Sequence, residues 1–166
     1  RIEKQFPKSD TRVPTLIRLG EAANKPETAA QAAQWLSQAA ELASDNALKA
    51  RAFAELGHAL ALSGKTEESA AAFAKSAELT GGATDAGRQA SLSAARVLAA
   101  SGRDEEALKR LDTLLSGEAS ASDSTLRKAR LMRARLLAKT GKFEAAAADY
   151  AQYVGKDFET QADGEG

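Results

Sequence analysis

A short phrase that returns three times constrains the fold of this chain more than any other feature of its sequence. It reads Leu60-Ala-Leu-Ser-Gly64-Lys-Thr-Glu-Glu, then Leu98-Ala-Ala-Ser-Gly102-Arg-Asp-Glu-Glu, then Leu137-Ala-Lys-Thr-Gly141-Lys-Phe-Glu, so its glycines lie 38 and then 39 residues apart. A repeat of this length is typical of stacked pairs of helices. It does not favour one globular core wound around a catalytic cleft.

Apolar residues precede each of these glycines at spacings of three and four, which predicts a helix that ends near the glycine. The spacing is carried by Phe53, Leu56 and Leu60, by Leu92, Ala95 and Ala99, and by Leu131, Ala134 and Ala138. Glycine tolerates the left-handed backbone that ends a helix and reverses the chain. Each phrase therefore predicts a helix, a tight turn and a second helix that packs antiparallel to the first.

The second helices show two further regularities. Thr66 and Asp104 are expected to accept hydrogen bonds from the free N–H groups of the first turn, next to acidic residues that suit the positive helix end. Small residues let helices approach and large ones fill the remaining space, as a stack requires. The small ones lie five residues after each glycine (Ser69, Ala107, Ala146) and the large ones nine after (Phe73, Leu111, Tyr150).

The same organisation extends toward the N-terminus in a less regular form. Leu16, Ile17, Leu19 and Gly20 begin a helix just after Pro14, and Asn24-Lys25-Pro26-Glu27 stands in place of the glycine phrase. We expect one repeat array over residues 11–154, in units of about 11–43, 44–82, 83–121 and 122–154, with Ser44, Thr84 and Ser122 as helix N-caps. Residues 1–10 are expected to end a preceding helix or linker, and residues 155–166 to form a flexible tail.

The best-preserved unit reads Phe53-x-x-Leu56-Gly57-x-x-Leu60, then Gly64, Glu67-Glu68-Ser69 and Phe73, and Leu16-x-x-Leu19-Gly20 opens the earlier unit in the same way. Over Thr11 to Val154 the chain resembles a degenerate, alanine-rich tetratricopeptide repeat (TPR) array. It departs from that family because its units exceed the usual length of about 34 residues, and because Ala95 and Ala134 replace the family's glycine. The resemblance implies an all-α, right-handed α-solenoid of about four repeats, whose first helices line a concave groove.

Composition excludes several kinds of site. The 23 Lys and Arg residues balance 23 Asp and Glu residues, whereas nucleic-acid binders usually carry a basic excess. Without cysteine there is no disulfide, thiolate metal site or cysteine nucleophile. The one histidine, His58, cannot by itself build a His-based metal site or a triad. We therefore expect no enzyme, no catalytic or metal site, no cofactor and no nucleic-acid partner.

The sequence leaves the cellular compartment open. No apolar run approaches the roughly 18 residues that a membrane span needs, and Arg1 to Asp10 has no apolar stretch typical of a signal peptide. A chain that opens at Arg-Ile-Glu-Lys without a Met is expected to be a piece of a longer, bacterial-type protein. Proteins without cysteine occur in the cytoplasm and in the bacterial periplasm.

One stripe of residues carries a prediction about function. His58, Arg96 and Arg135 lie six residues before the three glycines, and first helices that pack about 10 Å apart would align them as a ladder. Arg51, Lys128 and Lys139 extend this ladder, and Ala54, Leu92 and Leu131 are expected to form an apolar floor. Such a groove would hold an acidic peptide or a terminal carboxylate by charge-assisted bonds. A solvated helix face that happens to be basic gives the same pattern.

We therefore expect a non-enzymatic protein–protein interaction scaffold that binds an extended or helical partner segment, on the acidic side, in a partly basic concave groove. The alternative is a structural spacer or assembly subunit of an envelope or secretion complex, which associates with itself through the ends of its repeats. Tyr150 and Tyr153 motivate this alternative because no following helix is expected to cover them.

Overall fold

The computed structural model describes residues 11–82, 84–116 and 124–162, with the backbone alone from residue 154 onward. Within these ranges the chain forms eight α-helices and no strand. In chain order they are α2 (Arg12–Ala22), α3 (Ala29–Leu42), α4 (Asn46–Leu62), α5 (Thr66–Thr80), α6 (Asp85–Ala100), α7 (Asp104–Leu115), α8 (Ser124–Lys139) and α9 (Phe143–Ala162).

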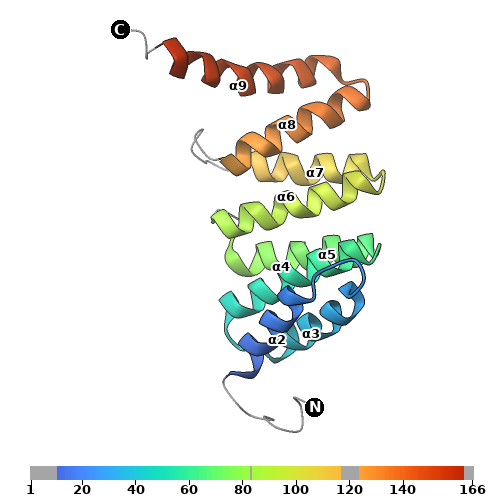
Figure 1. The fold of residues 1–166 in the computed structure, drawn as a ribbon. Coiled ribbons are helices and arrows are strands. Elements are labelled where there is room, and N and C mark those ends of the chain that lie inside the picture. The colour runs from blue at the N-terminus through green and yellow to red at the C-terminus, as the bar shows by residue number, and fades with distance from the viewer. Residues whose placement is uncertain (1–10, 83, 117–123, 163–166) are drawn as a thin grey trace.

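The helices form antiparallel pairs that stack in one direction, from α2 and α3 near the N-terminus to α8 and α9 near the C-terminus (Figure 1). Each helix packs against the next one along the chain. The described part of the chain is therefore an all-α solenoid of four helix pairs, as the repeating phrase predicted.

The predicted boundary of the C-terminal tail is wrong. Helix α9 continues past Val154 and Gly155 and ends at Ala162. No proline interrupts this stretch, and a single glycine inside a helix costs only about 1 kcal/mol, so the helix runs on beyond the last repeat position. The predictions for residues 1–10, for Ser122 and for residues 163–166 lie outside the described residues.

The three predicted glycine turns share one geometry. Gly64, Gly102 and Gly141 have φ angles of 73°, 80° and 79°, which confirms the left-handed conformation. In each turn the N–H after the glycine donates to the carbonyl five residues earlier, as from Lys65 to Leu60 at 2.9 Å. The glycine N–H donates to the carbonyl three residues earlier, which completes a Schellman motif. Because the same turn is used each time, the two helices of a pair meet in nearly the same register.

The predicted caps are partly wrong. Helices α5 and α7 begin at Thr66 and Asp104, directly after the glycine turn, and neither start has a side-chain cap. The carboxylate of Asp104 instead accepts from Lys139 Nζ at 2.6 Å. Helix α6 begins after Thr84, whose hydroxyl accepts from Gly87 N–H as predicted, whereas α4 is capped by Asp45 and not by Ser44.

Close contacts between helices follow the predicted alternation of small and large residues. Ser69, Ala107 and Ala146 are all buried, and Phe73 and Leu111 are buried behind them. The Phe73 ring lies against Gly57, where an added Cβ would meet ring carbons at 2.9 Å. Ser69 Oγ donates to the Gly57 carbonyl at 2.7 Å across the same interface. The absence of a side chain at Gly57 therefore lets α4 and α5 approach closely.

The last helix pair is held differently. The main core cluster draws its buried residues from α5 to α8, and none comes from α9. Arg133 of α8 instead donates from Nε and Nη2 to both carboxylate oxygens of Asp149 in α9, at 2.7 and 2.6 Å. The side chain of Asp149 is 4% exposed, and Arg133 also donates to Asp112 of α7 at 2.9 Å. Hydrogen bonding to Asp149, partly opposed by burial, raises the pKa of Arg133 above its ordinary value.

We predict that Arg133→Leu lowers the free energy of unfolding by about 3 kcal/mol, because it leaves the buried carboxylate of Asp149 without a partner. Urea denaturation measures this change. Adding Asp149→Ala should recover most of the loss, because the second helix pair already has this combination of residues. Leu56 lies eight residues before Gly64 and Ala72 lies eight after it, as Arg133 and Asp149 do around Gly141. A double variant as unstable as the single one would contradict this account of the pair.

Candidate functional site

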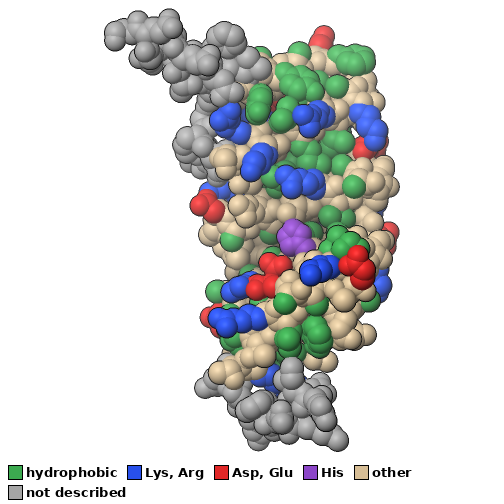
Figure 2. Space-filling view, viewed as in Figure 1, with side chains coloured by type: hydrophobic (Ala, Val, Ile, Leu, Met, Phe, Trp, Pro, Cys, Tyr) green, Lys and Arg blue, Asp and Glu red, His purple; other side chains and the backbone are tan. Residues whose placement is uncertain are grey.

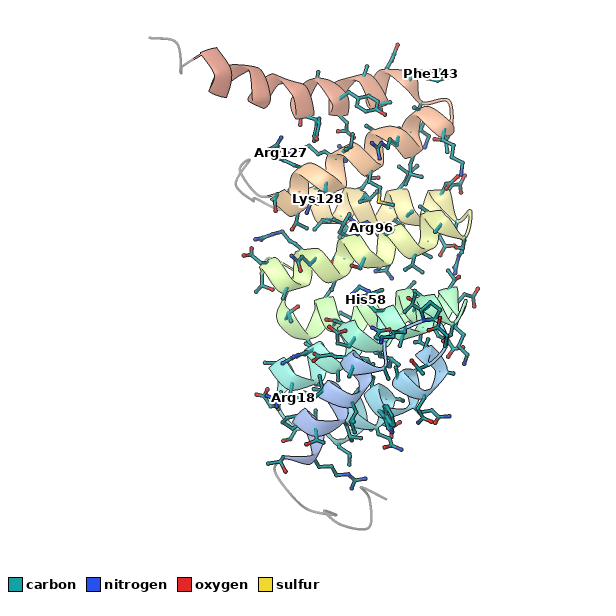
Figure 3. All side chains as sticks on the ribbon, viewed as in Figure 1. Arg18, His58, Arg96, Arg127, Lys128 and Phe143 are labelled. Carbon is teal, nitrogen blue, oxygen red and sulfur yellow. The ribbon has the colours of Figure 1, made fainter. Side chains whose placement is uncertain are left out.

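The first helices of the four pairs, α2, α4, α6 and α8, share one face of the molecule, which we call the first-helix face (Figures 1 and 2). His58 of α4, Arg96 of α6 and Lys128 of α8 all lie on it (Figure 3). The residues predicted from the positions of the glycines therefore come from consecutive first helices. Whether they bind a partner stays a prediction.

The cations of the predicted ladder divide into two groups. Arg51 donates to Glu21 of α2 at 2.6 Å, and Lys139 is paired with Asp104. Arg96, Lys128 and Arg135 are exposed and form no ion pair within the described part of the chain. Figure 2 shows Lys and Arg side chains over α6 and α8, gathered around apolar ones. Within the predicted ladder, positive charge without an ion pair is therefore concentrated on α6 and α8, while Arg18 of α2 is a further exposed cation in the same view (Figure 3).

The apolar floor is present only in part. Leu92 is 5% exposed and packs in the core cluster of α5 to α8, so its side chain is not accessible to a partner. It is buried because α6 and α8 pack directly against each other, which covers the position that the sequence placed on the floor. Ala54 and Leu131 are half-buried and remain in reach of the surface.

A hollow of about 370 Å³ opens between α4 and α6. Whereas α2 packs against α4 and α6 against α8, close packing between α4 and α6 is missing from the described chain. Helix α5 lies behind the opening and closes its base. The hollow is lined by Ala47, Ala50, Arg51, Ala54, Glu55, His58, Phe73, Ser76, Thr80, Ala86, Gln89, Ala90 and Ser93.

His58 lies at the wall of this hollow. Its side chain is exposed, and its ring stands edge-on to the buried Phe73 ring, with the centroids 4.8 Å apart and the planes at 81°. Such an edge contact between two rings contributes about 0.5–1.5 kcal/mol beyond simple burial. The one imidazole of the chain therefore has a defined orientation at the edge of the hollow.

The described residues include no group of three or more His, Cys, Asp or Glu side chains that could hold a metal ion. No helix in the described ranges has the length and apolar character needed to cross a bilayer. Elsewhere a crevice of about 560 Å³ runs along α7, with Lys109, Arg110 and Leu114 among its lining residues.

No protein-family model matches the sequence, and no curated protein matches it. Among solved structures, MamA superposes with a TM-score of 0.74 at 16% identity, over 96% of this chain and 86% of that one. The TPR-like repeats of a Podosopora anserina protein described as a kinesin light chain superpose with a TM-score of 0.72 at 16% identity, over 92% of this chain and 78% of that one.

This chain folds as an array of TPR-like repeats. The glycine turns, the antiparallel pairs and the superpositions over nearly the whole chain agree on this architecture. Arrays of this kind serve in general as scaffolds for contacts between proteins, through extended surfaces formed by successive repeats. At 16% sequence identity these similarities show a shared fold and nothing more about this chain.

Two features of this TPR-like array were missed by sequence reasoning. The Arg133–Asp149 pair could have been found, because the two residues lie eight positions before and after Gly141 and an antiparallel hairpin brings such positions together. The hollow beside Ala54 had a weaker signal. The corresponding positions in the other first helices hold Ile17, Leu92 and Leu131, so alanine at this point indicates missing volume.

Proposed function

We propose that this TPR-like array binds an acidic segment of a partner protein on its first-helix face, over α6 and α8. The observation that carries the proposal is the group of three exposed cations, Arg96, Lys128 and Arg135, without ion pairs in the described part of the chain. The other two cations of the predicted ladder, Arg51 and Lys139, already have carboxylate partners.

Charge and shape both support this assignment. Guanidinium groups form short, charge-assisted bonds with carboxylates, and Arg can do so with two parallel bonds. The half-buried Leu131 lies on the same helix as Lys128 and Arg135, so apolar contact is available beside the charges. A complementary charge pattern raises the association rate and excludes basic partners.

Charge reversal tests the proposal. We predict that Arg96→Glu with Arg135→Glu weakens binding of acidic peptides by about tenfold or more, because each substitution removes an attraction and adds a repulsion. Suitable ligands come from selecting a displayed random-peptide library on the unaltered chain, with affinities measured by fluorescence anisotropy.

The control is Lys109→Glu with Arg110→Glu on α7, which changes the net charge equally at residues away from the predicted ladder. This control should bind the selected peptides about as well as the unaltered chain at physiological ionic strength, where charges beyond roughly 8 Å are screened. The proposal fails if the selected peptides carry no acidic bias, or if both double variants bind equally.

A second candidate function, assembly through the C-terminal end of the array, is favoured by one observation. Phe143 at the start of α9 is 70% exposed, the highest exposure of the large apolar side chains described. The predicted tyrosines are better covered, because Tyr150 and Tyr153 are half-buried and Arg127 lies 5.4 Å from the Tyr153 ring. This candidate places Phe143 in a contact with a second copy or a further subunit.

For self-association, the expected result is a sedimentation coefficient that rises with protein concentration and stops rising in Phe143→Ser. The substitution replaces an exposed ring by a hydroxyl and removes the apolar area that a contact would bury. Analytical ultracentrifugation of both proteins makes the comparison. A concentration-independent monomer in the unaltered chain excludes association between copies.

A further inference from the structure

We infer that the hollow between α4 and α6 receives one aromatic side chain of the acidic segment, which anchors that segment on the first-helix face. The inference rests on the proposed function and adds a specific partner chemistry to it. It is carried by the shape and lining of the hollow and by the arrangement of charges around it.

The hollow exists because two rows of small side chains face each other. Ala50 and Ala54 of α4 line the hollow together with Ala86 and Ala90 of α6. The position of Ala54, three residues before Gly57, corresponds to Ile17, which lies three before Gly20. Counted from the turn glycines, it also corresponds to Leu92 and Leu131. Among the four first helices, only α4 has alanine at this position, so the side-chain volume that the other three helices supply is missing between α4 and α6.

The size and lining of the hollow favour one large, flat side chain. A volume of about 370 Å³ lies at the low end of sites that hold small ligands. The buried Phe73 and Ala90 give the lining an apolar part beside the side chains of Ser76 and Thr80, and the imidazole of His58 forms part of the wall. A partner ring there could contact both rings in the offset or edge-on geometries that aromatic groups prefer. An aromatic residue in a pocket is also the usual energetic centre of a protein interface.

The charges around the hollow give the bound segment a direction. On the α4 side of the hollow Arg51 is already paired with Glu21, so Glu55 would repel a partner carboxylate there. Three exposed cations without ion pairs, Arg96, Lys128 and Arg135, lie on the other side, on α6 and α8. The anchoring ring therefore enters beside α4, and the acidic residues that accompany it extend over α6 toward α8.

Two short synthetic peptides test this inference. One is acidic with a single tryptophan at one end, and the other has alanine in place of that tryptophan. The first should bind the unaltered chain at least about tenfold more tightly, since burying a large apolar side chain contributes roughly 1.5–3 kcal/mol. It should also shift the ring-proton NMR signals of His58, which are assigned without ambiguity because the chain has one histidine.

The decisive variant is Ala54→Leu, which fills the hollow with the side chain already present at the corresponding positions of α6 and α8. It should lower the affinity of the tryptophan peptide to that of the alanine peptide and leave the alanine peptide unaffected. The matched control is Ala71→Leu, at an exposed position of α5 outside the hollow. If Ala54→Leu fails to fold, Ala86→Leu at the exposed opposite rim makes the same test.

The outcomes separate the two proposals. Equal binding of both acidic peptides, or an unchanged tryptophan peptide affinity in a folded Ala54→Leu or Ala86→Leu variant, overturns the anchor and leaves the acidic-segment proposal standing. Failure of both peptides to bind the unaltered chain contradicts the proposed function and the anchor together.

Discussion

The structure depends on one repeated constraint, the left-handed glycine turn that fixes how two helices meet. Gly64, Gly102 and Gly141 close Schellman motifs with nearly the same φ angle, so each second helix starts at the same point relative to the first. A fixed register means that distance from the glycine decides which side chains touch. The contact between Gly57 and Phe73 and the ion pair between Arg133 and Asp149 both follow from it.

The helix pairs share this register but differ in the side chains that meet at the interface. In the second pair the two helices meet closely, with Phe73 against Gly57 and a buried hydrogen bond from Ser69 to the Gly57 carbonyl. In the fourth pair a two-pronged ion pair joins α8 to α9, and α9 contributes no buried residue to the main core cluster. A buried ion pair adds little net stability over an apolar contact but is costly to break on one side. The fourth pair therefore contains an interaction in which the loss of either partner alone is costly.

Between pairs, the first-helix face is closed at one step of the stack and open at another. Leu92 is buried where α6 and α8 meet, whereas Ala54 leaves a hollow where α4 faces α6. Because protein interiors are close-packed, an unfilled volume in a regular stack lies open to an incoming side chain. Internal ion pairs then neutralise Arg51 and Lys139, so the cations of the predicted ladder that remain unpaired all lie on the α6–α8 side of the hollow.

The sequence by itself determined the helix–turn–helix repeat. Glycine spacing, helical periodicity and alternating residue size act through residues that are close in the chain, so the pattern alone predicts the local structure. It also placed His58, Arg96 and Arg135 on consecutive first helices, because equal distances from equal turns give equal positions. Only the tertiary structure decided which cations are neutralised, as Arg51 by Glu21, and which apolar side chains are covered, as Leu92 is. Both outcomes depend on the distance between neighbouring pairs. That distance depends on the volumes of side chains from several helices together, so it cannot be predicted from any single stretch of the sequence.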